Sequence, residues 1–553
     1  MEMISKTMPT HGRSTSCQGV SFDSPHPLLD SNRGEYNGRW VWIPWNPSNS
    51  IKAFPSPKVL SRTVSRPSSH YCDLNFDPKD IDDEDVYELE PQHGDHEEKK
   101  ITLRAALDVE KQESIRKGQQ ASNKSRLSII LLDQGLFTVY KRLFATCFTS
   151  NIIALVLAIS GHFPFGKHRP TLISMANILT LILCRSEAFL RIVFWSVVKV
   201  LGHPCVPLFI KTTTTSFLQS LGGIHSSCGV SSVAWLIYSL VLTLKAPENT
   251  STEIVFVATT IAALLILSCL SAFPLIRHLH HNVFERTHRF AGWIALALLW
   301  AFVVLTVCYN PKTKSYNQIS IPTLAGKQEF WFTFAITLFI MLPWLSIKRV
   351  PVSVTAPSGH ASLIKFEGGI PAGLLGRISR SPLSEWHAFG IISNGKDNHM
   401  MLAGAVGDFT KGLVSHPPNH LWVRGLHFAG LPYLVNMYNR AVLVATGSGI
   451  CVFLSFLLQP CNADVCMVWV TKGVEENFGK EIMEMISGYP KEKIIIHDTM
   501  ISGRPNIAKI SIEAAKNWKA EVVVVTSNPQ GSKDVVSACK TAGFAAFGPI
   551  WDS

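Results

Sequence analysis

A glycine-rich turn between an apolar strand and a helical run is the first feature of this sequence that could bind a ligand. The segment AVLVATGSGICVFLSFLL occupies 441–458, with Gly447 and Gly449 on either side of Ser448. Glycines let a backbone approach a pyrophosphate closely, and the N-terminus of a following helix offers free N–H groups and a positive dipole end. A lone GxG also occurs in tight strand–helix turns that bind no ligand. The neighbouring elements must therefore decide between a nucleotide-binding turn and a purely structural one.

His387, in the segment SEWHAFGIIS (384–393), is a second candidate. Taken alone, a histidine in an apolar strand is more often a packed core residue than a ligand. The chain also has 12 cysteines. None of them forms a CxxC pair, so they predict neither a zinc site nor a disulfide framework.

The elements that would position these residues change along the chain. Short β-like runs such as SLIKFEG and LWVRG predict a small antiparallel barrel over 350–437. Apolar strands then alternate with helical stretches over 438–553, which predicts an α/β domain with a doubly wound parallel sheet. The glycine-rich turn follows the first strand of that sheet, and this position favours nucleotide binding.

The segment 126–349 is mainly apolar, in runs of about the 20 residues needed to cross a bilayer. We expect a multi-pass domain of six helices, at about 143–161, 172–200, 216–244, 254–274, 288–309 and 330–347. Arg185 and Glu187 interrupt the second helix, and we expect a salt bridge inside the bundle because unpaired charges are costly in lipid. Basic residues are more frequent beside the loops on the side of the termini, which predicts that both termini are cytosolic. The membrane is expected to be the plasma membrane or the endoplasmic reticulum.

Composition excludes several classes of protein. With 47% hydrophobic and 16% charged residues, the chain is not a collagen, a coiled coil or an entirely disordered protein. The net charge is +11, but the basic residues form no long block, so no nucleic-acid partner is expected. Residues 1–125 are rich in Ser and Pro and then acidic, which predicts a disordered tail that could recruit a protein partner. The N-terminus has no apolar run and predicts no cleavable signal peptide.

In its order of membrane helices, barrel and GSG-containing sheet, the chain resembles the ferric reductase and NADPH oxidase superfamily. It resembles more closely the TmpA-like membrane flavoproteins of fungi and plants, over about 140–553. The motifs that carry the resemblance are EWHAFG, GDFTKGL (407–413), VLVATGSGI, HDTMISGRPN (497–506) and the terminal FGPIWDS. The resemblance implies a ferredoxin-reductase-like module, with an FAD-binding barrel followed by an NAD(P)-binding domain, attached to a ferric-reductase-like membrane domain.

The same resemblance implies the site residues. Those expected to bind FAD are Trp386, His387, Ala388, Phe389, Thr410 and Lys411. Those expected to bind NAD(P)H are Gly447, Ser448, Gly449, Ile450, Lys472 and Arg504. Two cations, Lys472 and Arg504, suit a 2′-phosphate, so NADPH is preferred over NADH. The candidate catalytic residues are Trp551, which would stack on the isoalloxazine, and Thr526, which would lie near the nicotinamide.

This sequence departs from the superfamily at three places. Ala388 replaces the usual proline, and Cys451 adds a side chain where a glycine commonly follows GSGI. Thr526 stands where the superfamily has the thiol that lies near the nicotinamide. We expect binding to survive these changes while hydride transfer slows.

The positions of the histidines that could bind haem test the resemblance further. Electron-carrying relatives place two histidines on each of two helices, 13 residues apart, whereas His225 and His288 are followed at that spacing by Tyr238 and Ala301. The outer ligands are therefore absent. His225 and His288 could still ligate a single inner haem, but two hydrogen-bonded histidines are favoured, so at most one haem is expected.

The predicted function is a membrane flavoprotein oxidoreductase. It would move electrons from NAD(P)H through FAD to an unidentified acceptor on the cytosolic side or in the membrane. The alternative is a catalytically weak FAD- and nucleotide-binding membrane protein that acts as a redox sensor or signalling component, which Cys451 and Thr526 favour. A transporter has only Arg185 and Glu187 in its favour, and no inverted repeat supports it.

Overall fold

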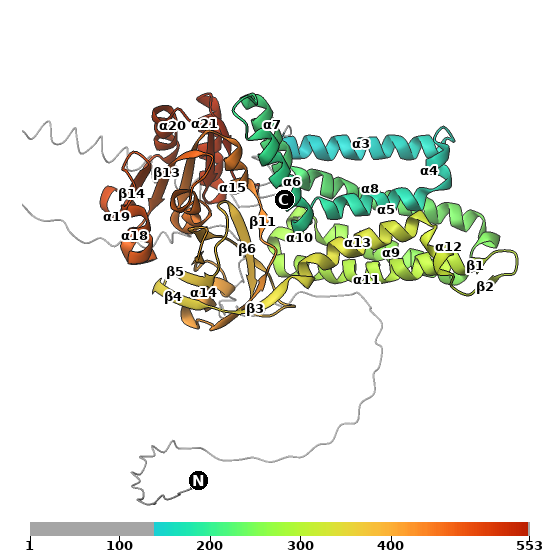
Figure 1. Ribbon diagram of the computed structural model, residues 1–553. Helices are drawn as coiled ribbons and strands as arrows, with labels where there is room; N and C mark the ends of the chain where they lie inside the picture. The colour runs from blue at the N-terminus through green and yellow to red at the C-terminus, as the bar shows by residue number, and fades with distance from the viewer. Residues whose placement is uncertain (1–137, 551–553) are drawn as a thin grey trace, which may run out of the picture. The chain divides into compact units, whose positions relative to one another are not determined.

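The computed structural model describes residues 138–550, in which a helical part is followed by a part built on β-sheets (Figure 1). The predicted tail at 1–125 and Trp551 lie outside the described residues. The helical part contains α3 (Val139–Ile159), α4 (Pro164–His168), α5 (Pro170–Leu183), α6 (Glu187–Leu201), α7 (Leu208–Gln219), α8 (Leu221–Lys245), η1 (Pro247–Asn249), α9 (Thr252–Ser271), α10 (Pro274–Leu279), α11 (His281–Cys308), α12 (Ile321–Ala325) and α13 (Gln328–Leu345). A short hairpin of β1 (Tyr309–Asn310) and β2 (Ser315–Tyr316) follows α11.

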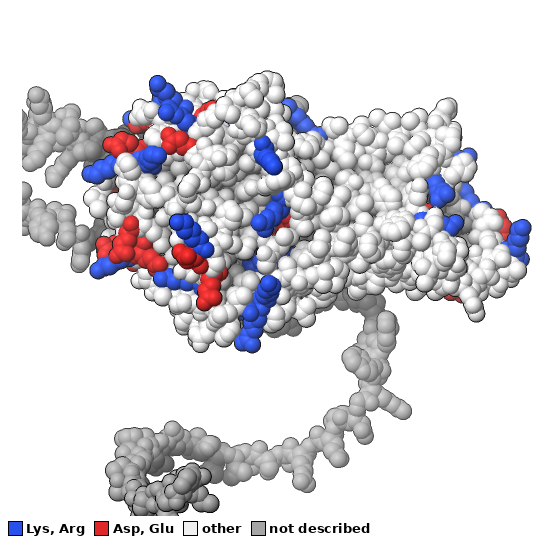
Figure 2. Space-filling view, viewed as in Figure 1, with Lys and Arg blue, Asp and Glu red and all other residues white. Residues whose placement is uncertain are grey.

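Five helices of this described range, α3, α8, α9, α11 and α13, are long and apolar enough to cross a membrane. Their surfaces fit that composition, because the long sides of the helices are free of charged atoms on the face drawn in Figure 2. Charged side chains gather instead at the two ends of the helical part and over the sheets.

The prediction of one membrane helix over 172–200 is wrong, because two helices, α5 and α6, occupy this segment. The chain leaves the helical conformation at Arg185 and Ser186. The hydroxyl of Ser186 then accepts a hydrogen bond from the N–H of Phe189 at 3.4 Å, and Glu187 occupies the first turn of α6. A serine cap and an acidic first residue are both favourable at a helix N-terminus, so the local sequence begins a second helix here.

α6 and α7 pack mainly against the sheet-bearing part. Phe194 of α6 and Leu218 of α7 belong to the same buried cluster as Leu434 and Tyr438. The hydroxyls of Thr215 in α7 and Tyr438 are 2.8 Å apart. These two helices therefore join the helical part to the module that follows it.

Two antiparallel sheets follow α13. The first has the order β11-β6-β10-β3 with β7 also paired to β6, and the second has the order β4-β5-β9-β8. The strands are β3 (Ile347–Pro351), β4 (Ser353–Ser358), β5 (Ala361–Glu367), β6 (Leu374–Ser379), β7 (His387–Gly390), β8 (Ile392–Ser393), β9 (Asn398–Gly404), β10 (His420–Arg424) and β11 (Phe428–Ala429), with α14 (Asp408–Ser415), α15 (Leu431–Leu434) and η2 (Val435–Met437). Ile364 and Met401 of one sheet and Ile378 and Leu421 of the other share one buried core.

A parallel sheet with the order β14-β13-β12-β15-β16 completes the chain. Its strands are β12 (Arg440–Thr446), β13 (Asp464–Thr471), β14 (Ile494–Asp498), β15 (Val522–Thr526) and β16 (Ala545–Phe547). α20 (Ile507–Trp518) and α21 (Pro529–Thr541) pack on one face, while α16 (Ser455–Leu458), α17 (Val474–Phe478) and α18 (Lys480–Ser487) follow the loops of the first strands, and α19 (Thr499–Ser502) follows β14. Valine-rich strands such as β15 are buried on both faces, as in sheets covered on both sides.

The loop after β12 lies where the strand order reverses. β12 has β13 on one side and β15 on the other, and ligands of such sheets bind outside the strand ends at this point. The GSG turn is itself the start of a 3-10 helix, η3 (Gly447–Val452), and the helical run predicted after it is reduced to the end of η3 and the four-residue α16. Pro460 limits that helix, because the residue before a proline disfavours the helical conformation.

Candidate functional site

A cleft open to solvent lies between the antiparallel sheets and the first loop of the parallel sheet. The lining comes from β7, the end of β9, the start of α14, η3 and the end of β15. Its residues are Leu375, His387, Ala388, Phe389, Gly390, Leu402, Gly404, Val406, Gly407, Phe409, Thr410, Ser448, Gly449, Cys451, Val452 and Thr526.

One wall of the cleft is aromatic. The rings of His387 and Phe409 are stacked, with centroids 4.0 Å apart and planes inclined by 12°, and Phe389 lies 6.4 Å from Phe409. Burial lowers the pKa of His387 to about 4, against the opposing charge of Glu385, so the imidazole is neutral at pH 7. A flat, uncharged wall of this kind can pack against a planar ring system.

The opposite side of the cleft is built by close backbone approach. A Cβ atom at Gly404 would lie 2.6 Å from the hydroxyl oxygen of Ser448. A Cβ atom at Gly449 would lie 3.0 Å from both Cγ2 and the carbonyl oxygen of Thr526. The two parts of the module therefore meet through glycines, and larger residues at these positions would push the cleft apart.

The turn before α14 is fixed by Thr410. Its hydroxyl oxygen accepts hydrogen bonds from the N–H groups of Val406 and Gly407, both at 3.0 Å. Phe409 and Thr410 line the cleft, so the N-terminal turn of α14 borders it, and a helix N-terminus favours an anionic group. Asp408 is exposed in the same turn and offsets part of that positive potential.

The two cations predicted to bind a 2′-phosphate lie at neighbouring strand ends. Lys472 follows β13 and Arg504 follows α19, and both residues are exposed. The carboxylate of Asp498 connects their loops, because it accepts hydrogen bonds from the N–H groups of Gly473 at 2.9 Å, Val474 at 3.1 Å and Met500 at 2.9 Å. Burial opposes ionisation of Asp498, but these donors lower its pKa below the usual value, so the charged form ties the loops together.

Several predicted residues do not line the cleft. Lys411 is exposed on α14, Gly447 accepts a hydrogen bond at its carbonyl from the indole of Trp469 at 2.8 Å, and Ile450 is fully buried. Trp386 is 4% exposed, donates its indole N–H to the carbonyl of Pro382 at 3.1 Å, and packs against the guanidinium of Arg424, 4.9 Å from its ring.

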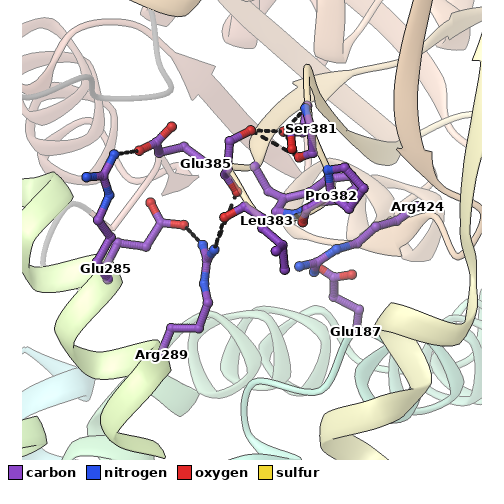
Figure 3. Close-up of polar contacts among 12 residues, drawn as sticks. Glu187, Glu285, Arg289, Ser381, Pro382, Leu383, Glu385 and Arg424 are labelled. Atoms are coloured by element: carbon purple, nitrogen blue, oxygen red, sulfur yellow. Dashed lines mark hydrogen bonds and ion pairs between the residues drawn. The ribbon is translucent and has the colours of Figure 1, made fainter. Parts of the chain in front are cut away.

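The expected salt bridge of Arg185 and Glu187 inside the bundle is wrong. Glu187 pairs instead with two arginines of the first antiparallel sheet: Nε of Arg377 donates to Oε1, and Nη1 of Arg424 lies 3.2 Å from the same oxygen. Figure 3 shows Glu187 and Arg424 facing each other across this junction. Glu187 forms these ion pairs because the sheet places two guanidinium groups beside the first residue of α6.

A second contact at the junction comes from the start of α11. Arg289 pairs with Glu285 and donates to the carbonyl oxygens of Leu383 at 3.3 Å and Ser384 at 3.4 Å (Figure 3). Arg286 pairs with Glu385 at 2.8 Å. Helix α11 thus holds the loop 381–385, and this loop leads directly into β7, whose residues line the cleft.

The two histidines considered for haem are each bonded to a helix backbone. Nδ1 of His225 lies 2.8 Å from the carbonyl oxygen of Leu181, and Nδ1 of His288 lies 3.4 Å from that of Ser268. Within 138–550, no cluster of three or more His, Cys, Asp or Glu side chains could hold a metal ion.

Residues that sequence reasoning missed are Phe409, Asp498 and the glycine at 404. Phe409 and Asp498 lie inside the motifs GDFTKGL and HDTMISGRPN, so the signal was present in the quoted segments. Gly404 carries no such signal, because its role depends on Ser448, which lies in η3, 44 residues further along the chain.

The C-terminal part of the chain matches a family model described as "Adenylate-forming reductase 03009, C-terminal domain" over residues 431–553. Two curated relatives from Coprinopsis cinerea are similar over most of the chain. Adenylate-forming reductase 06235 is 33% identical over 466 residues, which is 82% of this chain and 44% of that protein. Adenylate-forming reductase 03009 is 33% identical over 457 residues, or 81% of this chain and 44% of that protein. The chain thus spans less than half the length of these relatives.

Among solved structures, a ferredoxin-NADP+ reductase from Plasmodium falciparum with 2′P-AMP matches with a TM-score of 0.28 and 14% identity, over 36% of this chain and 94% of that one. Phthalate dioxygenase reductase matches with a TM-score of 0.28 and 11% identity, over 37% of this chain and 69% of that one. These matches are all to reductases. The closer resemblance to TmpA-like membrane flavoproteins stays a prediction.

Proposed function

We propose that this protein is a membrane flavoprotein oxidoreductase that takes electrons from NADPH through FAD and delivers them to an acceptor in the membrane or on its cytosolic side. The observation that carries the proposal is the cleft itself. It brings together residues that the motifs assigned separately to flavin and to nucleotide binding, namely His387 to Phe389, Thr410, Ser448, Gly449 and Thr526.

The residues of the cleft suit a flavin. Bound FAD would supply the two-electron chemistry that no side chain here can perform. The neutral, stacked ring of His387 and the ring of Phe409 offer a planar apolar wall, and the start of α14 offers N–H groups to a diphosphate. Cys451 narrows the same cleft with a side chain where a glycine would leave more room.

A nicotinamide dinucleotide would bind on the side of the cleft that the parallel sheet forms. Ser448 and Gly449 border the cleft at the strand-order reversal, the usual place for such a ligand. Lys472 and Arg504 lie on loops joined by Asp498, at the ends of adjacent strands. We propose that both cations contact a 2′-phosphate, because two charge-assisted contacts suit a dianion better than a ribose hydroxyl.

The membrane part of the proposal rests on the apolar helices. We propose that α3, α8, α9, α11 and α13 cross the bilayer and that the shorter α5, preceded by α4, makes a sixth crossing, which leaves both termini in the cytosol. The backbone hydrogen bonds of His225 and His288 orient their Nδ1 atoms. We propose that these histidines hold at most one haem.

The test is the visible spectrum of the detergent-purified protein before and after anaerobic addition of NADPH. The proposal expects a flavin band that bleaches with NADPH. A flavin band that ignores NADPH would favour the sensor alternative, and no flavin at all would refute the cleft assignment. A Soret band would reveal haem.

Arg504→Ala tests the nucleotide end with the flavin end intact. We expect the KM for NADPH to rise about tenfold, which corresponds to the loss of one charge-assisted hydrogen bond of about 1.5 kcal/mol. The KM for NADH should change little. Lys509→Ala is the matched control, because Lys509 is an exposed cation on the neighbouring helix α20. Equal losses with both nucleotides would contradict the 2′-phosphate assignment.

A further inference from the structure

The segment of α6 and α7, joined by residues 202–207, carries exposed apolar side chains that no described part of the chain covers. On α6, Ile192 is 64% exposed, Trp195 is 52% exposed and Val200 is 64% exposed. Their spacing puts them on one stripe, opposite Phe194, which is buried against the sheet-bearing part. α6 is therefore apolar on both sides, although only its inner side has a protein partner.

α7 continues the same pattern. Phe209 is 69% exposed and Phe217 is 42% exposed, eight residues apart and so on one side of the helix. Thr215 and Leu218 point the other way, because Thr215 bonds to Tyr438 and Leu218 belongs to the buried cluster. Contiguous exposed apolar side chains of this size mark an interaction surface rather than ordinary protein exterior.

Chain connectivity indicates what covers this surface. Three residues separate α6 from α5, and Ser220 alone separates α7 from α8. Both α5 and α8 cross the bilayer in the proposed function, on which this inference rests. The segment of α6 and α7 must therefore stay close to the membrane surface on the side of the sheets.

The charge on α6 matches the headgroup region of a membrane. Nζ of Lys199 lies 5.0 Å from the ring centroid of Trp195, and both residues are exposed. A tryptophan beside a lysine whose stem covers apolar surface is typical of the membrane interface, where the ring lies at headgroup level and the ammonium faces phosphate.

We propose that the α6–α7 segment is an interfacial anchor. Ile192, Trp195, Val200 and Phe209 insert into the headgroup region of the leaflet on the side of the sheets, and α6 lies along that surface without crossing the bilayer. The inner stripe of α6 packs on the module that contains the cleft, and Glu187 at its start holds Arg377 and Arg424. Lipid contact through the outer stripe therefore fixes the module against the membrane.

Depth measurements in lipid nanodiscs test this anchor. The full chain would carry Cys205→Ser, Cys17→Ser and Cys72→Ser, and the label taken up by the remaining cysteines would be subtracted by using this parent protein. Ile192→Cys would then be labelled with an environment-sensitive fluorophore in nanodiscs of phosphatidylcholine and phosphatidylserine. Quenching by lipids with a nitroxide near the headgroup or deep in the acyl chain reports the depth of the label.

Two matched positions separate the possible failures. Leu338→Cys lies mid-helix on α13 at 42% exposure, and Ile501→Cys lies on α19 at 85% exposure. We expect Ile192→Cys to be quenched most by the shallow nitroxide, Leu338→Cys most by the deep one, and Ile501→Cys by neither.

Each deviation has a distinct meaning. If Ile192→Cys is as insensitive as Ile501→Cys while Leu338→Cys is quenched, the anchor is refuted and the spanning helices stand. If Ile192→Cys is quenched most by the deep nitroxide, α6 crosses the bilayer and the interfacial placement is wrong. If Leu338→Cys is quenched by neither lipid, the membrane part of the proposed function itself fails. Phe209→Cys repeats the test on α7 should the variant on α6 not fold.

Discussion

Replacing Glu187 with glutamine should destabilise the protein far more than removing an exposed ion pair. The Glu187 side chain is 8% exposed, and its partners Arg424 and Arg377 are 15% and 30% exposed. Removing one partner of a buried ion pair costs roughly 3–5 kcal/mol, because the remaining charge is left without compensation. Arg377 retains some solvent, and Arg424 keeps its contact with the Trp386 ring, so we expect the low end, about 3 kcal/mol.

The assay is urea-induced unfolding of the detergent-solubilised protein, followed by tryptophan fluorescence. Glu329→Gln is the matched control, since Glu329 pairs with Arg169, which is 52% exposed, at 3.3 Å. Exposed pairs contribute at most about 1 kcal/mol, so the control should change the free energy of unfolding little.

A double-mutant cycle decides whether the pair itself carries the effect. Glu187→Gln combined with Arg424→Gln should cost clearly less than the sum of the two single variants, because each single change leaves a charge unpaired. The reasoning would be refuted if the two costs were additive, or if Glu187→Gln cost no more than Glu329→Gln.

Three further predictions concern the module that contains the cleft. Gly390→Ala should destabilise this module by about 1–3 kcal/mol, because the new Cβ atom would lie 2.7 Å from the backbone N and Cα of Val452. Gly488→Ala is the control, because its Cβ atom would meet nothing within 4 Å, and its urea midpoint should be near that of the unchanged protein. Equal midpoints for the two variants would contradict this prediction. Burial lowers the pKa of His427 to about 4, with help from the charge of His399, and that of His387 likewise, so both are neutral when folded and protonate near pH 6.5 when unfolded. Stability should therefore be constant above about pH 6.5 and fall between about 6.5 and 4, and His427→Gln should lessen that fall; an unchanged pH profile of the urea midpoint would count against the burial argument. Asp498→Ala should release the loops of Lys472 and Arg504, because charge-assisted hydrogen bonds of about 1.5–3 kcal/mol are lost. In steady-state kinetics, the KM for NADPH should rise about tenfold while kcat changes little. An unaltered KM would show that Asp498 is not needed to hold the two loops in place.

Local patterns were enough for the elements of this protein. Long apolar runs predicted the helices that became α3, α8, α9, α11 and α13, because spanning length and hydrophobicity are properties of one contiguous segment. Strand–helix alternation likewise predicted the parallel sheet of β12 to β16, and the GSG turn does follow its first strand. The motifs also singled out His387, Thr410 and Ser448, and all three line the cleft.

Only the tertiary structure decided which of these residues meet. The cleft joins residues from His387 to Thr526, and Gly404 has its structural role only because Ser448, in η3 after β12, lies against it. Glu187 was expected to pair within its own bundle, yet it pairs with Arg377, 190 residues away, and α6 consequently packs on the sheets. Trp386 lies next to His387 in sequence but precedes β7, and its ring packs against Arg424 instead of lining the cleft. Apolar periodicity specifies that a helix has a face to bury, but the partner of that face depends on distant charges and surfaces, and no local pattern of the sequence contains them.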